Sequence, residues 1–195
     1  MKLFKLCFIL GLIFTSAASA TVTVQIIANS TTGQIQDSTA ATLPDGSLMR
    51  VGFFDIPALT SLTPSELLDY DIVNPLFTEF VTFTSASGNF LANDSSLPAT
   101  NVGDQVYLWV FDSPTAPTAT EYGIFTSTLW LSPADTGSLN MVSSAINTIT
   151  VGSTAGSSPT NYLLTPVPEP AHFALLLGSL GLGVILLRRH SNRRR

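Results

Sequence analysis

Short apolar segments in which hydrophobic and polar positions alternate follow one another along residues 21–151. In the first segment, Val22, Val24 and Ile26 alternate with threonine and glutamine. A period of two predicts a strand with one buried face and one polar face. Gly, Pro, Asn and Asp separate the segments, as expected of turns. The pattern predicts a mainly β domain, a β-rich α+β fold with a single antiparallel sheet or a sandwich and one or two short helices.

The strongest strand signal covers residues 104–111, which read DQVYLWVF. Aliphatic residues fall on one face of this strand, whereas Tyr107, Trp109 and Phe111 fall on the other. Since both faces are apolar, we expect a central strand with both sides buried. We therefore interpret Tyr107 and Trp109, like Tyr122 and Trp130, as core residues rather than an exposed platform for stacking sugars. Further strands are predicted over residues 48–55, 121–126, 128–131 and 144–152.

Capping residues predict a helix that begins near residue 63. Thr63 can cap it, Pro64 fits the first helical position, and Glu66 completes a capping box. The residue before Pro75 is pushed out of the helical region, so this helix should end there. A second short helix is predicted over residues 76–83, where phenylalanines would form a packing face.

The N-terminus has the features of a secretory signal peptide. Lys2 and Lys5 precede an apolar stretch over residues 6–14, which is too short to span a bilayer comfortably. Ala18 and Ala20 then place small side chains where signal peptidase requires them. We expect an N-terminal signal helix over residues 1–20, cleaved by signal peptidase after Ala20, and export of the rest of the chain.

Residues 173–187 form an apolar run at the other end of the chain, and residues 188–195 form a basic tail. Fifteen residues in a helix span roughly 22 Å, which is less than the roughly 30 Å hydrocarbon core of a bilayer. The run is predicted to be a C-terminal transmembrane helix that serves as a provisional membrane anchor. Arginines after it would hold the end in the cytoplasm and leave the domain outside. A permanent membrane anchor is the alternative interpretation of this tail.

Pro168, Glu169 and Pro170 stand before the apolar run, and Arg188 and Arg189 follow it. In this order, residues 167–195 resemble the PEP-CTERM sorting signal of Gram-negative bacteria. The resemblance implies that exosortase, a membrane-embedded enzyme, recognises the tail and processes it near the Pro-Glu-Pro motif. It also implies a precursor anchored in the inner membrane, then delivery to the cell surface or to an extracellular polysaccharide matrix.

Charge and composition exclude several functions for the domain between these two signals. Arg50 is its one basic residue against twelve acids, which gives a formal charge of −11. A nucleic acid is therefore excluded as a partner, because its phosphates are bound by many lysines and arginines. The only cysteine, Cys7, lies in the signal peptide, so neither a disulfide nor a thiolate metal site is available.

The same domain lacks most groups that carry catalysis. It contains no histidine, lysine or cysteine, because His172 and His190 both lie in the tail. A hydroxyl nucleophile lacks a base, a catalytic zinc lacks its usual ligands, and a Schiff base lacks its amine. Glycoside hydrolysis by two carboxylates remains chemically open, but the acids form no recognisable pair. Asp69 and Asp71 are the nearest candidates for a cation site, although solvated charges at a helix end explain them better.

Three short segments carry the remaining sequence predictions, two for glycosylation and one for a linker. Asn29-Ser30-Thr31 and Asn93-Asp94-Ser95 match the acceptor pattern for N-glycosylation. Residues 152–166 are rich in Gly, Ser, Thr and Pro and are predicted to be a flexible linker between the β-rich exported domain, residues 21–151, and the sorting signal.

The signals and the missing catalytic groups lead to one functional hypothesis. The chain is expected to be an exported structural or adhesive protein of a Gram-negative cell surface or exopolysaccharide matrix, without enzymatic activity or a cofactor. The alternatives are a carbohydrate-active enzyme that works through carboxylates, and a module that binds a glycan or ice. A flat, regular threonine array would indicate the ice-binding module.

Overall fold

The computed structural model describes residues 21–98, 101–134, 136–156 and 160–168, and within them the chain is β-rich with short helices. This result confirms the β-rich class that alternation predicts. The signal helix and the transmembrane helix, predicted over residues 1–20 and 173–187, lie outside the described residues. Within the described part, no helix is long and apolar enough to cross a membrane.

The first sheet contains three strands in the order β5-β1-β8. The central strand pairs antiparallel with β5 and parallel with β8, so the pairing is not purely antiparallel. Only one face of this sheet is buried, since burial alternates along β1. The strands are β1 (Thr21–Ala28), β5 (Phe90–Pro98) and β8 (Ser138–Val142).

The second sheet contains six strands, five of them in the order β12-β7-β6-β3-β4, with β9 paired to β7. Strand β6 lies between β3 and β7, which confirms the predicted central strand. Strand β7 runs without a break through both segments that alternation predicts next to it. The strands are β3 (Leu48–Phe54), β4 (Phe77–Thr84), β6 (Gln105–Phe111), β7 (Glu121–Leu131), β9 (Thr148–Val151) and β12 (Thr165–Pro166).

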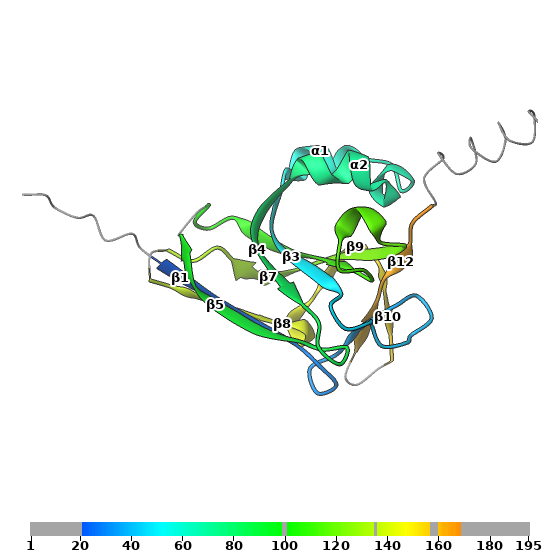
Figure 1. Ribbon diagram of the computed structural model, residues 1–195. Coiled ribbons are helices and arrows are strands. Elements are labelled where there is room, and N and C mark those ends of the chain that lie inside the picture. Colours follow the sequence, from blue (N-terminus) through cyan, green and yellow to red (C-terminus); the bar gives the residue numbers. More distant parts are fainter. Residues whose placement is uncertain (1–20, 99–100, 135, 157–159, 169–195) are drawn as a thin grey trace, which may run out of the picture.

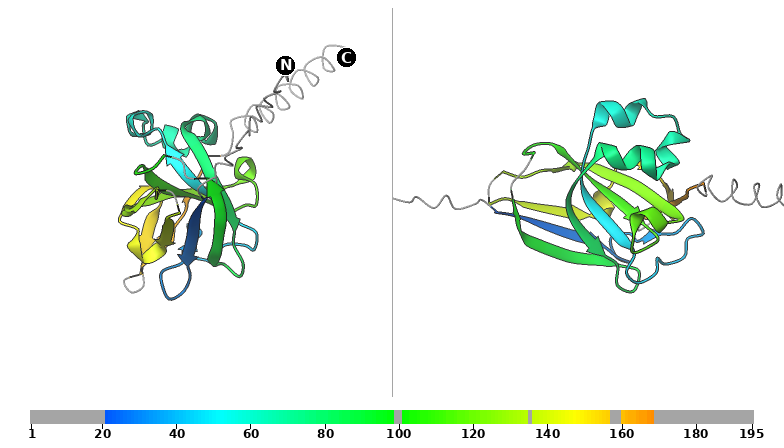
Figure 2. Two further views of the ribbon diagram at one scale, coloured as in Figure 1. Left: turned by 90° about the vertical axis from the view of Figure 1, so that its left-hand side faces the viewer. Right: turned by 45° about the horizontal axis from the view of Figure 1, so that its top comes forward.

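These two sheets and a group of helices form three layers (Figure 1). The helices cover the outer face of the six-stranded sheet, and the three-stranded sheet packs on its inner face, as both views in Figure 2 show. The helical elements are α1 (Ile56–Ser61), η1 (Glu66–Leu68), α2 (Tyr70–Val73), η2 (Asn74–Leu76), η3 (Ala116–Thr118) and η4 (Ser143–Ala145).

The two faces of β6 contribute to two different cores. Val106, Leu108 and Val110 pack with aliphatic residues of the three-stranded sheet. Trp109 and Phe111 pack with aromatic and aliphatic residues beneath the helices. The six-stranded sheet is therefore buried on both sides, whereas the three-stranded sheet is buried on one.

The predicted helix over residues 76–83 is wrong, because this segment is strand β4. The α-helix α2 ends at Val73, but Asn74 keeps helical angles (φ −60°, ψ −38°) and the chain continues through Pro75 as the 3₁₀ turn η2, so the expected exclusion of the residue before proline from the helical region is wrong. Beyond the short turn η2, the sequence FTEFVTFT is rich in threonine and aromatic residues, which suit a pleated strand. Pairing with β3 satisfies one side of its backbone, since β4 is an edge strand, and Gly52 lies at the irregularity in this pairing.

The predicted capping box is present, but it begins a shorter element than expected. Thr63 N–H donates to the Glu66 carboxylate at 2.8 Å, and Glu66 N–H donates to the Thr63 hydroxyl at 3.3 Å. The 3₁₀ turn η1 follows it. Helix α1 was not predicted; Asp55 caps it by accepting a hydrogen bond from Ala58 N–H at 3.2 Å. The signal for it, an aspartate two residues before Pro57, is short and common.

The predicted flexible linker over residues 152–166 is also wrong in its described residues. They form β12 and a small third sheet of β10 (Ser153–Ala155), β11 (Asn161–Leu163) and β2 (Ile35–Gln36). Tyr162 is 4% exposed and packs edge to face on Phe125, with ring centroids 5.8 Å apart. A few large apolar residues in a small-residue sequence are thus enough to attach this segment to the body of the domain.

Candidate functional site

The aromatic residues that could have stacked on a sugar lie in the interior. Trp109 is fully buried, Trp130 and Tyr122 are 1% exposed, and Tyr107 is 9% exposed. Their burial confirms the prediction that they are core residues. The Tyr122 hydroxyl donates to the Leu67 carbonyl, which ties the helical layer to β7. Burial raises the pKa of Tyr122, and the nearby carboxylate of Asp69 raises it further.

Arg50 also serves the fold rather than a ligand. Its Nε donates to Glu79 at 2.7 Å and its Nη1 donates to Asn74 at 2.7 Å. The guanidinium lies 4.7 Å from the ring centroid of Phe77 and 5.1 Å from that of Trp109. These contacts join the helical layer, β4 and β6 around the one basic side chain of the domain.

Asp69 and Asp71 lie at the beginning of α2. The Asp69 carboxylate accepts a hydrogen bond from Asp71 N–H at 3.0 Å and so caps this helix. Within the described part of the chain, no group of three or more His, Cys, Asp or Glu residues is placed to hold a metal ion. Both acids are exposed charges, as predicted, but they stand at the beginning of α2 rather than at the end of a helix.

Other acids stabilise local turns. The Thr63 hydroxyl, and then its backbone N–H, lower the pKa of Glu66. Burial acts to raise the pKa of Asp37, but hydrogen bonds from Thr39 and Ala41 outweigh it and lower that pKa. Glu121 accepts hydrogen bonds from both the N–H and the hydroxyl of Ser38. Hydrogen bonds therefore favour the ionised forms of Glu66 and Asp37, whereas Glu121 ties β7 to the loop at Ser38.

One hollow brings two carboxylates together. Asp55 and Asp104 line a depression of about 320 Å³ at one end of β3 and β6, together with Phe54, Ile56 and Gln105. Both acids are exposed, and Asp55 is already engaged as the cap of α1. A glycosidase needs one acid that keeps its proton at neutral pH, which burial in an apolar environment would provide. Neither exposed carboxylate has that environment.

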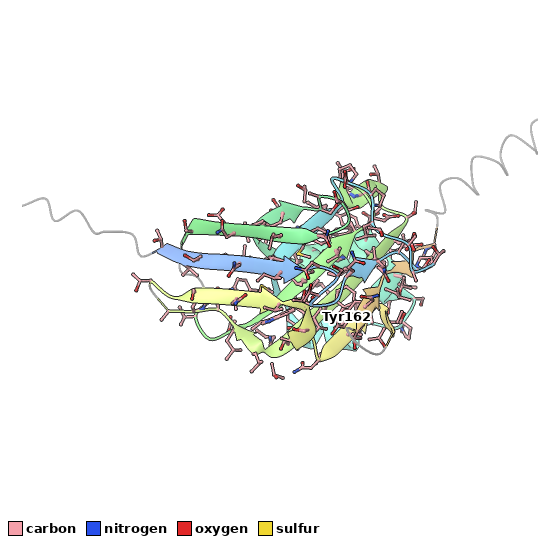
Figure 3. The ribbon with its side chains drawn as sticks, turned by 90° about the horizontal axis from the view of Figure 1, so that it is seen from below. Tyr162 is labelled. Carbon is pink, nitrogen blue, oxygen red and sulfur yellow. The ribbon has the colours of Figure 1, made fainter. Side chains whose placement is uncertain are left out.

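The outer face of the three-stranded sheet is the second candidate site. Gln25 on β1 lies opposite Asn93 on β5 and Asn140 on β8, so that three amides form one row across the strands. Figure 3, which views the molecule from below, shows these three strands side by side in front. Among the described residues, no helical element covers this face.

Two further rows flank the amides. Ile27 lies opposite Leu91 and Val142, which makes an aliphatic row, and Leu91 is 70% exposed. On the other side, Thr23 lies opposite Ser138, and the pairing with β5 is irregular here. We call this surface the amide face; it consists of Thr23, Gln25, Ile27, Leu91, Asn93, Ser138, Asn140 and Val142.

The amide face contains no charged side chain. Gln25, Asn93 and Asn140 make no side-chain hydrogen bond to any described part of the chain, so their donors and acceptors face solvent. The face contains a single threonine rather than the regular threonine array expected of an ice-binding surface. By contrast, the first potential glycosylation site, Asn29, accepts hydrogen bonds from Thr31 and Thr32 N–H.

No family model, curated protein or solved structure matches this chain.

Most residues of the predicted sorting and cleavage sites lie outside the described part of the chain: Ala18, Ala20, Glu169, Pro170, Arg188 and Arg189. Pro168 is the last described residue and is exposed. Just before it, Val167 N–H donates to the Thr120 carbonyl at 2.9 Å, and the Val167 side chain packs against the aromatic core. The domain therefore extends up to the first residue of the Pro-Glu-Pro motif.

Sequence reasoning did not find the amide face. The polar face of β1 is visible as alternation, but nothing in the sequence states which strands lie beside it. Asn93 and Asn140 are far from Gln25 in the chain, and β8 joins β1 through a parallel pairing. Asn93 and Asn140 lie on β5 and β8, which the sequence analysis did not predict as strands, so a search for uncharged polar positions on predicted strands would have found only Thr23 and Gln25.

Proposed function

We propose that this chain is an exported, non-catalytic domain that reaches the surface or the extracellular polysaccharide matrix of a Gram-negative bacterium. Signal peptidase removes residues 1–20, the C-terminal segment anchors the precursor in the inner membrane, and exosortase processes it near Pro168 to Pro170. The observation that carries the proposal is the order of the Pro-Glu-Pro motif, apolar run and basic tail at the C-terminus. A role as a structural or adhesive component follows from this destination.

The chemistry of the domain supports a non-catalytic role. Residues 21–168 contain no histidine, lysine or cysteine to act as a base or nucleophile. The carboxylates that share a hollow, Asp55 and Asp104, are exposed. The large aromatic residues are used in packing. What remains at the surface suits binding and adhesion better than bond cleavage.

Replacement of the motif in the host tests the sorting step. We expect a chain with Pro168→Ala, Glu169→Gln and Pro170→Ala to stay in the inner-membrane fraction, whereas the unchanged chain appears at the surface. Pro117→Ala, at an exposed proline in η3, is the matched control and should leave delivery unchanged. Equal delivery of the motif variant and the unchanged chain would contradict the proposal and favour a permanent anchor.

The alternative of a carboxylate-dependent carbohydrate-active enzyme is supported by one observation, the hollow that Asp55 and Asp104 share. It predicts that the chain releases reducing sugar from a polysaccharide and that Asp104→Asn abolishes this release. Under the non-catalytic proposal, no release occurs from neutral or acidic polysaccharides.

A further inference from the structure

The amide face is a surface whose chemistry differs from that of the rest of the domain. One arginine and twelve acids give residues 21–168 a formal charge of −11, yet the amide face contains no charged residue. An exposed leucine, Leu91, stands at its edge with 70% of its surface accessible. Leu129, outside this face, is 76% exposed, so it is the lack of charge beside a row of aliphatic side chains, and not one exposed leucine, that marks this face as a contact surface.

We infer that the amide face binds a neutral polysaccharide. This inference rests on the proposed function, because delivery to a polysaccharide matrix would bring the face and this ligand together. It adds the site and the ligand class, which the sorting signals do not specify.

The hydrogen-bonding groups of the face match a polyhydroxylated chain. Gln25, Asn93 and Asn140 each present an acceptor oxygen and a donor NH₂, and Thr23 and Ser138 add hydroxyls that can do both. A sugar hydroxyl also donates and accepts, so it can pair with any of these groups. The aliphatic row beside them can pack against the apolar faces of sugar rings.

Charge decides between ligand classes. An anionic polysaccharide would be repelled by the acidic domain, and the face offers no arginine or lysine to compensate. A cationic polymer would gain more from the acids elsewhere on the surface. A neutral polymer loses nothing to repulsion and finds complementary amides and hydroxyls on this uncharged face.

The size and regularity of the face suit an extended chain. Residues on one side of a strand recur about every 7 Å, and neighbouring strands lie about 5 Å apart. The amide row crosses all three strands at one register, and the aliphatic row runs parallel to it. A chain lying along these rows would meet amides on one side and aliphatic groups on the other.

A strand or second copy adding to the edge of this sheet is less well supported. Strand β5 is an edge strand, and its pairing with β1 contains an irregularity between Val22 and Val24. Asp94 stands opposite Val24 and therefore shares the inner side of the strand. Irregular pairing and an inward charge are features that oppose edge-to-edge association.

Affinity electrophoresis of the full chain tests the inference. The chain is produced in a bacterium that has neither exosortase nor an enzyme that glycosylates proteins. It is kept in a zwitterionic detergent that contains no sugar. It is then run through gels containing hydroxyethyl cellulose, galactomannan or dextran. Alginate serves as the anionic polysaccharide. We expect retardation by at least one of the neutral polymers and none by alginate.

Asn93→Asp with Asn140→Asp places two charges in the amide row with almost no change in shape. We expect binding to weaken roughly tenfold or more, since each residue loses a donor group that pairs with the ligand. Asn101→Asp is the matched control, because Asn101 is exposed beside the acidic hollow and outside the amide face. Circular dichroism checks that each variant is folded, and Asn140→Asp alone replaces the double variant if that variant is not.

Several results would overturn the inference: no binding to any of the three neutral polymers, binding to alginate alone, unchanged binding by the double variant, or selective loss with Asn101→Asp. A double variant that alters sedimentation of the chain without any polysaccharide binding would instead assign the face to a second copy. None of these results bears on the sorting proposal, which rests on where the protein is delivered and how its tail is processed.

Discussion

The outer faces of the six-stranded sheet and of the β5-β1-β8 sheet both arise from a period of two in the sequence, but described helices cover only the first of them. On β6, the outer residues are Tyr107, Trp109 and Phe111, and helices cover them. On β1, the outer residues are threonine, glutamine and isoleucine, and no helical element in the described part of the chain covers them. Large aromatic side chains gain from a cover because they bury 150–250 Å² each. Small polar side chains gain less from a cover, in agreement with the exposed Asn93 and Asn140 on this face.

The strongest test of this contrast is Trp109→Ala in the covered face. Trp109 contacts aromatic rings from the helical layer, β3, β4 and β7, including those of Phe54, Phe77 and Tyr122. Its removal should lower the free energy of unfolding by about 3–5 kcal/mol, as for other large core side chains. Denaturant unfolding measures this change. A loss below about 1 kcal/mol would mean that the helical layer is not a packed cover.

Tyr162→Ala extends the comparison to the segment expected to be a linker. Tyr162 packs on Phe125, and a Cβ at Gly33 would overlap the carbonyl oxygen of Thr160, so the segment lies close against the body. We expect a loss of about 3 kcal/mol in denaturant unfolding. Thr154→Ala, on an exposed residue of the same segment, is the control with a loss below about 0.5 kcal/mol. Equal, small effects of both substitutions would restore the linker interpretation.

Arg50→Ala tests how the covered face is held together. The Arg50 side chain is 13% exposed and joins Glu79 and Asn74 to the rings of Phe77 and Trp109. We expect a loss of about 2 kcal/mol, because two hydrogen bonds and the ring contacts disappear. Arg50→Lys keeps the charge but not the planar group, and should recover only part of the stability. Full recovery by lysine would show that charge alone matters.

Tyr122→Phe changes stability less, and in a pH-dependent way. Loss of the hydrogen bond to Leu67 should cost about 1 kcal/mol at neutral pH. Burial raises the pKa of Tyr122 in the folded state, so its contribution is complete below the unfolded pKa of about 10 and is lost as pH rises above it. Unfolding experiments between pH 8 and pH 11, as rough limits, should show a weaker decline for the variant. An identical decline would exclude Tyr122 as a source of alkaline sensitivity.

Substitutions in the amide face should have the smallest effect on stability. Asn93→Ala or Gln25→Ala removes side chains that make no hydrogen bond within the described domain, so the free energy of unfolding should change by less than about 0.5 kcal/mol. A loss above about 1 kcal/mol would show that these residues maintain the sheet rather than remain available to a ligand.

Sequence alone could predict those elements whose information is local. The alternation of β1, the alternation of β6 and the capping box of Thr63 and Glu66 are each read from neighbouring positions. The structure confirms each of them. Segment 76–83 was misread because its aromatic spacing fits a helix face as well as a strand, and only pairing with β3 decides. The attachment of residues 152–166 depends on distant partners such as Phe125.

The candidate sites also differ in whether their residues are neighbours in the sequence. The predicted sorting motif is contiguous, so the sequence alone names its residues. The amide face combines residues from three separated strands, and the hollow combines Asp55 with Asp104, so both depend on strand order. The two surfaces that the domain could use for contacts therefore became visible only in the folded chain.

The central claim, that this chain is sorted and processed as a precursor, is tested most directly by the intact mass of the protein in surface and matrix fractions of its host. We predict a polypeptide that begins at Thr21 and ends near Pro168 to Pro170, with any attached group adding a defined mass. Protein that retains the tail through Arg195 in all fractions would contradict the claim and leave a permanently anchored domain.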